Sequence, residues 1–207
     1  MYRLYDYPPS GNGYKVRLLL SHLGLPFEYV ALDILKGETR TPEFLAKNPN
    51  GRIPLLELEP GRYLAESNAI LFYLGQNTPF WPTEPLSQAR VMSWLFFEQY
   101  SHEPNIATPR FWLCHLPELN DYQTVALPEK QAQGYQALAV MEQHLAEHAF
   151  LVQERFTIAD IALYAYTHVA PEGGFDLDRF PHVQRWLGAI AAQPNHIPIT
   201  QTHFEIA

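Results

Sequence analysis

The stretch YPPSGNGYKVRLLLSHLG, residues 7–24, decides how the fold begins, because a loop rich in proline and glycine runs directly into a helix. Apolar residues recur at spacings of three and four, as expected for one face of an amphipathic helix: Val16, Leu19, Leu20 and Leu23. Gly24 is expected to end this helix, and Pro26 prevents it from resuming. Ser10 and Asn12 stand at its start, where such residues either cap a helix or hold a ligand.

The neighbouring patterns extend this helix into a βαβαββα unit over residues 1–76. Strands are predicted at 2–6, 27–32, 54–58 and 62–64, the last two joined at Pro60-Gly61 as a hairpin. A short helix is expected from Thr41-Pro42-Glu43, and a third helix is marked by Ile70, Tyr73 and Leu74. This order requires a right-handed crossover and gives a four-stranded mixed sheet.

The second half has a different pattern. Residues 77–86 contain three prolines and are interpreted as a stiff linker. Residues 87–207 are predicted to form an all-helical bundle, with helices over 87 to about 104, from Leu127-Pro128-Glu129 to about 148, within FTIADIALYAYTHVAPEGG, and from Pro181. The sequence therefore predicts an α+β domain at 1–76 followed by an all-α domain.

Composition limits the classes of function. The chain has 207 residues, and its net charge of −8 arises after residue 77, which disfavours nucleic acid as a partner. A single cysteine and scattered histidines offer neither a disulfide framework nor a metal site. No apolar stretch is long enough to span a bilayer and no signal-peptide core is present, so a cytoplasmic protein is expected.

Four stretches together resemble the cytosolic glutathione transferases. They are PPSGNGYKVRLLL, PEFLAKNPNGRIPLLEL, ESNAILFYL and FTIADIALYA. Each is weak alone, but their shared order and spacing are specific, and the match covers essentially the whole chain. The resemblance implies a thioredoxin-like N-terminal domain, an all-helical C-terminal domain, glutathione as co-substrate and a homodimer without nucleic-acid or membrane partners.

The first loop suggests two subgroups. Ser10 lies where serine-type members (theta, phi and zeta classes) carry their catalytic serine, whereas Asn12 matches an asparagine implicated in thiol handling in a bacterial, nu-like class that reduces disulfides. Tyr5 and Tyr7 could serve a tyrosine-type enzyme, but the loop pattern favours Ser10. The loop has no cysteine, which disfavours cysteine-type members.

The chemistry expected at this loop is activation of a thiol. A free thiol has a pKa near ~8.5, and lowering it by about two units requires a preference of roughly 2.7 kcal/mol for the thiolate. A hydroxyl donor and the positive end of a helix dipole can each supply part of it. Ser10 and Asn12 are therefore the candidate catalytic residues, although the loop alone favours simple helix caps and the three other stretches reverse that preference.

The remaining candidate binding residues follow from the resemblance. Pro54 would be cis, and Ile53 before it would offer its main chain to the cysteinyl part of glutathione. Glu66 would hold the γ-glutamyl ammonium and Ser67 its carboxylate, although this stretch by itself favours a helix cap with an acidic first turn. Arg40 is preferred for the glycyl carboxylate. Arg52 and Lys36 are its rivals.

The expected activity is a glutathione transferase that activates the thiol for attack on a hydrophobic electrophile, as in detoxification. The alternatives are a glutathione-dependent disulfide reductase and a non-catalytic glutathione-binding protein of the same fold. Cys114 is expected to be inert core, the four tryptophans to serve packing, and Thr157 with Asp160 to form a capping box. The electrophile is expected between the domains, with these candidate contacts: Tyr7, Pro9, His102, Asn105, Ile106 and Phe111. For His102, a solvated surface position is an equal alternative.

Overall fold

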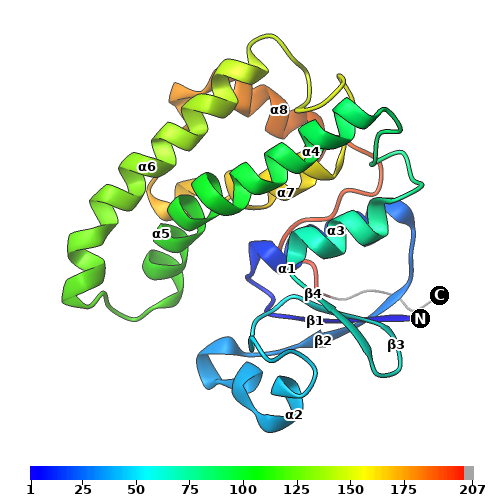
Figure 1. Ribbon diagram of the computed structural model, residues 1–207. Coiled ribbons are helices and arrows are strands. Elements are labelled where there is room, and N and C mark those ends of the chain that lie inside the picture. The colour runs from blue at the N-terminus through cyan, green and yellow to red at the C-terminus, as the bar shows by residue number, and fades with distance from the viewer. Residues whose placement is uncertain (203–207) are drawn as a thin grey trace. The chain divides into compact units, whose positions relative to one another are not determined.

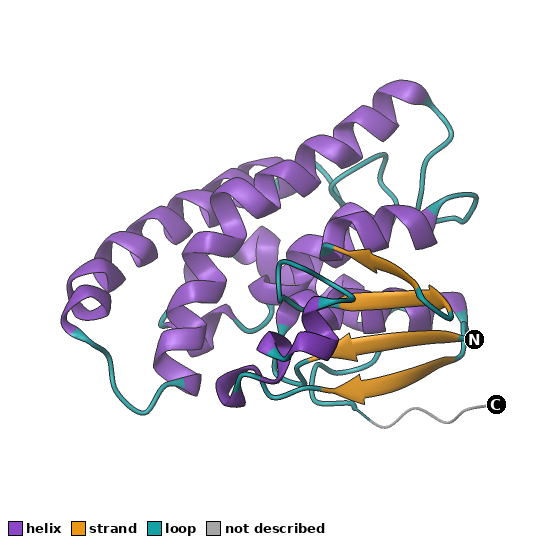
Figure 2. Cartoon of the chain, turned by 60° about the horizontal axis from the view of Figure 1, so that its bottom comes forward, coloured by secondary structure: helices purple, strands orange, loops and turns teal. Residues whose placement is uncertain are grey.

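The computed structural model describes residues 1–202, which form two compact units. In the first, four strands lie side by side in the order β2-β1-β3-β4 (Figure 2). They are β1 (Tyr2–Asp6), β2 (Phe27–Ala31), β3 (Leu55–Glu59) and β4 (Arg62–Ala65). β1 and β2 pair in parallel, and the other two pairs are antiparallel, which confirms the predicted mixed sheet.

Helices cover both faces of this sheet, α1 (Gly11–Leu23) and α3 (Ser67–Gly75) on one and α2 (Pro42–Leu45) on the other (Figure 1). Alternation along the strands explains this, because neighbouring side chains point to opposite faces. Tyr5 and Leu55 pack with Phe44 of α2, while Leu4 and Leu56 are fully buried too. The α+β thioredoxin-like prediction for this unit is confirmed, although Tyr73 of α3 is exposed.

The described end of the chain, residues 194–202, groups with this first unit. Side chains along α1 hold its backbone carbonyls. Ser21 donates to Asn195 O at 2.7 Å, Tyr14 donates to Ile197 O at 2.6 Å, and His22 Nδ1 lies 2.8 Å from Pro194 O. The division at 1–76, 77–86 and 87–207 stays a prediction.

The second unit, residues 79–193, is built from helices. They are α4 (Pro85–Phe97), α5 (Glu103–His115), α6 (Asp121–Leu145), α7 (Ile158–Thr167) and α8 (Pro181–Ala191), with a π-helical turn at Glu98–His102 between α4 and α5. α7 is buried throughout, and Trp186 of α8 is buried beside it. The predicted all-α fold class of the second domain is confirmed.

The predicted start of α6 at Leu127-Pro128 is wrong by a turn and a half. Asn120 caps the helix instead, accepting from Gln123 N at 2.9 Å, while the Gln123 side chain accepts from Asn120 N at 3.0 Å. This capping box provides partners for amides of the first turn, and α6 begins directly after Asn120. Pro128 therefore lies inside the helix and not at its start. Among residues 1–202, no helix combines the length and apolarity needed to cross a membrane.

Candidate functional site

The start of α1 has the geometry of a capped helix. Ser10 is its N-cap, and its Oγ accepts a hydrogen bond from Gly13 N at 3.2 Å. Ser10 remains partly exposed. A serine hydroxyl that accepts through a lone pair keeps one O–H to donate, so capping and donation to a sulfur are compatible. The capping interpretation is therefore correct for Ser10 and does not exclude a role toward a ligand.

A buried ion pair between Arg17 and Asp6 holds the loop that precedes α1. Arg17 Nε donates to Asp6 Oδ2 at 3.0 Å, and both side chains are fully buried. The same guanidinium donates to Pro8 O at 2.9 Å and to the carbonyls of Ile199 and Gln201 at 2.8 Å. Burial raises the pKa of Asp6, and the positive charge of Arg17 opposes that rise. One side chain thus ties the loop, β1 and the C-terminal segment together.

Gly13 allows α1 to approach Asp6 closely. A Cβ placed on Gly13 would lie 1.6 Å from Asp6 Oδ1, so any side chain at this position would force α1 or Asp6 to move. Asp6 Oδ1 also accepts from Tyr7 N at 2.7 Å. Glycine is therefore required at position 13 by this contact within the protein itself.

Three polar side chains join the start of α1 to the start of α3. Lys15 Nζ lies 2.8 Å from Asn12 Oδ1 and 3.3 Å from Ser67 Oγ, and Ser67 Oγ lies 3.3 Å from Asn12 Oδ1. Lys15 and Ser67 are buried, whereas Asn12 is partly exposed. The candidate thiol residue Asn12 and the candidate γ-glutamyl residue Ser67, predicted separately, thus belong to one network.

Lys15 was missed by the sequence interpretation. Its position on the helix predicted no particular role, and a lysine is almost never fully buried without a partner. The only available signal was its spacing, because residue i+3 from Asn12 lies on the same face of a helix. The second partner, Ser67, lies 52 residues away and gave no local signal.

Glu66 occupies a strained position at the entry to α3. Its φ of 71° and ψ of 115° are unusual for a residue with a side chain, and it is exposed. Its carboxylate makes no capping hydrogen bond to α3, although its carbonyl accepts from Ile70 N at 2.9 Å. The alternative interpretation of Glu66 as an ordinary acidic helix cap is therefore not supported.

The Ile53–Pro54 peptide bond is cis, as the resemblance implied. Ile53 is partly buried and packs against the cluster of Tyr5, Phe44 and Leu55, immediately before β3. A main chain held this way at the beginning of a sheet strand can pair with an extended peptide. Its proposed contact with glutathione stays a prediction.

The candidate cations differ in how they are held. Arg40 is exposed, and its Nη1 donates to Asn50 O at 3.1 Å. The Arg40 guanidinium therefore lies against the loop that precedes Arg52. Lys36 pairs with Asp33 at 3.2 Å. Arg52 is exposed, and its carbonyl accepts from Asn48 Nδ2 at 2.8 Å. Among the three, Lys36 has its charge engaged by a carboxylate, which makes it the weaker rival.

Tyr5 serves the sheet. Its hydroxyl donates to Glu57 Oε2 at 3.1 Å and accepts from Lys47 Nζ at 3.2 Å, and its ring is buried. A hydroxyl committed in this way is poorly placed to activate a thiol. The preference for Ser10 over Tyr5 and Tyr7 stays a prediction.

Two predictions for the helical unit need correction. Cys114 is exposed, with Sγ 3.3 Å from Glu172 O, because it lies on the outer side of α5, so it is not core. His102 is fully buried, with Nε2 2.8 Å from Thr167 Oγ1, and is therefore not a solvated residue. Asn105 and Ile106 are also buried, whereas Phe111 is partly exposed.

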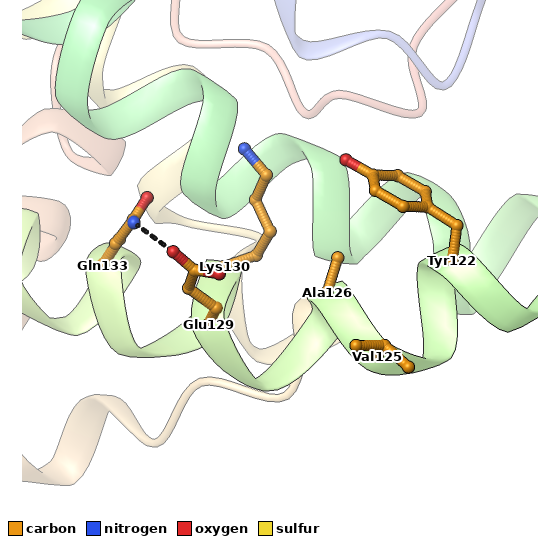
Figure 3. A pocket seen from close by; sticks show the side chains of 6 residues that line it. All are labelled: Tyr122, Val125, Ala126, Glu129, Lys130 and Gln133. Carbon is orange, nitrogen blue, oxygen red and sulfur yellow. Dashed lines mark hydrogen bonds between the residues drawn. The ribbon is translucent and has the colours of Figure 1, made fainter.

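The helical unit also contains a pocket of about 400 Å³ along α6. It is lined by Tyr122, Val125, Ala126, Glu129, Lys130 and Gln133. The Lys130 ammonium and the Tyr122 hydroxyl point to the same side of the helix (Figure 3), and Lys130 Nζ lies 3.4 Å from Asn105 Oδ1. The sequence missed this pocket because half of its lining precedes the helix start that was predicted.

Comparisons with known proteins agree with this geometry. The family model "Glutathione S-transferase, N-terminal domain" matches residues 1–76, and "Glutathione S-transferase, C-terminal domain" matches residues 105–194. A glutathione S-transferase structure from Pseudomonas fluorescens is 50% identical, with a TM-score of 0.94 over 97% of this chain and 99% of that chain.

More distant relatives cover the same span. Glutathione S-transferase 3 of Zea mays is 36% identical over 200 residues, covering 93% of this chain and 90% of that protein. A structure of Ure2p in complex with glutathione is 27% identical, with a TM-score of 0.83 over 94% of this chain and 90% of that chain. The chain belongs to the glutathione S-transferase family.

Proposed function

We propose that this protein is a glutathione transferase that binds glutathione in its first unit and activates the thiol. The network of Asn12, Lys15 and Ser67 carries the proposal, because it brings the start of α1 and the start of α3 within hydrogen-bonding distance. A ligand with a thiol near one end and a charged group near the other could bind to both helix starts.

Each part of glutathione then has a candidate partner. The sulfur lies at Ser10 and Asn12, and the cysteinyl backbone pairs with the main chain of Ile53 before Pro54. Glu66 binds the γ-glutamyl ammonium, while Ser67 and the first amides of α3 bind its carboxylate. Arg40 binds the glycyl carboxylate, with Arg52 as the alternative. The uncapped carboxylate of Glu66 supports this assignment.

The reaction follows from thiol activation. The hydroxyl of Ser10 and the amide of Asn12 donate to the sulfur, and the positive end of α1 favours its negative charge. The thiol proton passes to water, and the thiolate attacks an electrophilic carbon, forming a C–S bond as the leaving group departs. The protein supplies ionisation and proximity, since glutathione is the nucleophile.

The test is a pair of measurements on the purified protein. Calorimetry should detect binding of reduced glutathione by the unmodified chain. Ser10→Ala should then lower turnover of an activated aryl halide by roughly ten- to a hundredfold, which corresponds to about 1.4–2.7 kcal/mol, with little change in glutathione affinity. Absence of binding would reject the whole proposal, and unchanged turnover would reject Ser10 as the activating residue.

A second candidate activity is reduction of disulfides by glutathione. The direct hydrogen bond between Lys15 and Asn12 favours it, because Asn12 is then a fixed donor at the sulfur and Ser10 is less needed. In that case a small disulfide should be a better substrate than the aryl halide, and Asn12→Ala should reduce turnover more than Ser10→Ala. The opposite ranking supports the transferase.

The third possibility is a binding protein without turnover, which glutathione binding without product from a panel of electrophiles and disulfides would identify. We also propose a homodimer, from the resemblance to the family. Sedimentation equilibrium should give twice the mass of 23.8 kDa, and a monomer would exclude the dimer.

A further inference from the structure

Lys15 is a buried cation close to both ends of the proposed glutathione site. Its side chain is among the largest fully buried ones in the described chain, and neutral oxygens of Asn12 and Ser67 accept from its ammonium. Taking an ammonium out of water costs several kcal/mol unless hydrogen bonds and charges compensate for it. The contacts with Asn12 and Ser67 place Lys15 between the two helix starts of the proposed site.

The place of Lys15 along the helix adds to this argument. It is the fifth residue of α1, close to the end where the helix dipole is positive. Cations stabilise the opposite end of a helix, so helix stability does not account for a lysine here. An anion bound at the start of α1 would benefit from both the dipole and the ammonium.

Lys15 also determines how the amide of Asn12 is turned. An ammonium can only donate, so the atom of Asn12 that faces it at 2.8 Å is the carbonyl oxygen. The Ser67 hydroxyl, at 3.3 Å from the same oxygen, agrees with this orientation. The amide nitrogen of Asn12 therefore lies on the side away from Lys15. A carbonyl oxygen that accepts from a cation also makes its own N–H a stronger donor.

We propose that Lys15 is a positioning residue for thiol activation: by holding the Asn12 oxygen it directs the Asn12 N–H group at the bound sulfur and favours the thiolate. This inference rests on the proposed function. It places Lys15 behind Asn12, without contact to the sulfur, and it predicts that the effect of Lys15 passes through Asn12.

The experiment compares Lys15→Met with the unmodified protein. Methionine keeps much of the length of lysine and removes the charge and the donor. The pKa of the bound thiol, followed by thiolate absorbance against pH, should rise by about one unit, so that about tenfold less thiolate is present at a pH below both values. Binding of S-methylglutathione, which has no thiol to ionise, should change by less than about threefold.

Matched variants separate this role from a structural one. Lys15→Arg keeps the charge and a donor and should restore most of the thiolate. Lys47→Met makes the same exchange at a lysine that contacts Tyr5, and it should leave the thiol unchanged. If Lys15→Met does not fold, Lys15→Gln, which keeps a hydrogen bond but not the charge, takes its place, with an expected rise of the same sign.

The double variant that combines Lys15→Met with Asn12→Ala tests whether Lys15 acts on the thiol through Asn12. If Lys15 acts through Asn12, adding Lys15→Met to Asn12→Ala should raise the thiol pKa little further, whereas additive effects overturn the positioning role. An unmodified protein that binds no glutathione refutes the proposed function. A protein that binds and lowers the thiol pKa equally with and without Lys15 refutes this inference alone.

Discussion

Two helix starts in this protein use the same kind of residue and have opposite surroundings. At α7, Thr157 caps the helix and Asp160 completes a capping box, and both side chains are fully buried. At α1, Ser10 caps the helix through one bond of 3.2 Å, and Ser10 and Asn12 are partly exposed. The first start is closed by the protein, and the second is open.

The difference shows what separates a structural cap from a candidate binding site. Asp160 accepts from Leu151 N at 3.0 Å, Thr157 N at 2.8 Å and Trp186 Nε1 at 3.0 Å, so the protein itself supplies its donors. The start of α1 keeps polar groups at the surface and a buried lysine behind them. Residue type alone does not distinguish the two, whereas exposure and partners do.

The largest effect is expected at the closed start. Asp160→Ala should lower the free energy of unfolding by about 3–5 kcal/mol, because it leaves several buried donors without an acceptor. Urea unfolding of both proteins measures this loss of unfolding free energy. Asp121→Ala removes an exposed acid from the first turn of α6 and should cost less than about 1 kcal/mol. Equal losses would mean that burial of the Asp160 network does not matter.

The same carboxyl should give a pH dependence. Burial raises the pKa of Asp160 to about 6. An unfolded chain loses this proton near pH ~4, so between about pH 4 and about pH 6 the folded state binds more protons. The free energy of unfolding should therefore fall as pH rises across this window, by on the order of 2 kcal/mol, and then level off. Asp160→Asn should remove this slope, and a slope that persists would assign it to other groups.

The open start should be sensitive at its point of closest contact. Gly13→Ala places a Cβ against Asp6 Oδ1 and should cost about 2 kcal/mol in unfolding free energy. It should also lower thiol activation, since α1 must move. Gly188→Ala is the control, because Gly188 is an exposed helical glycine with nothing within 4 Å of a new Cβ, and it should be neutral or stabilising.

The smallest effects on stability are expected when the caps of α7 and α1, Thr157 and Ser10, are each replaced by alanine. Thr157→Ala should cost about 1–2 kcal/mol, and Ser10→Ala less than about 1 kcal/mol, because the hydrogen bond of the Ser10 cap is 3.2 Å long and Ser10 is partly exposed. Their effects on aryl halide turnover should run in the opposite order. If Ser10→Ala destabilises the protein more and leaves turnover intact, Ser10 is a structural cap like Thr157.

Much of the local structure could be predicted from the sequence. The α1 stripe from Val16 to Leu23 and the stop at Gly24 were correct, because side-chain spacing and backbone freedom act within a few residues. The start of α6 was predicted too late, since Pro128 was treated as a first-turn residue and the Asn120 capping box was overlooked. Cys114 was predicted as core because apolar neighbours in sequence do not say which side of a helix faces solvent.

The site was predicted only as separate pieces. Ser10, Asn12, Glu66 and Ser67 were each interpreted as either cap or ligand contact, and their roles toward glutathione stay predictions. The connection through Lys15 could not be foreseen, because it depends on α1 and α3 lying side by side.

The sequence by itself determined the order of strands and helices in the first unit, the all-helical class of the second unit and the family to which the chain belongs, because these depend on neighbouring residues and on motif order. Only the tertiary structure decided that Lys15 is buried between Asn12 and Ser67, that Gly13 rests on Asp6, and that Arg17 holds the carbonyls of Ile199 and Gln201. Burial and hydrogen bonding between residues far apart in the chain arise only when the sheet and its helices are assembled.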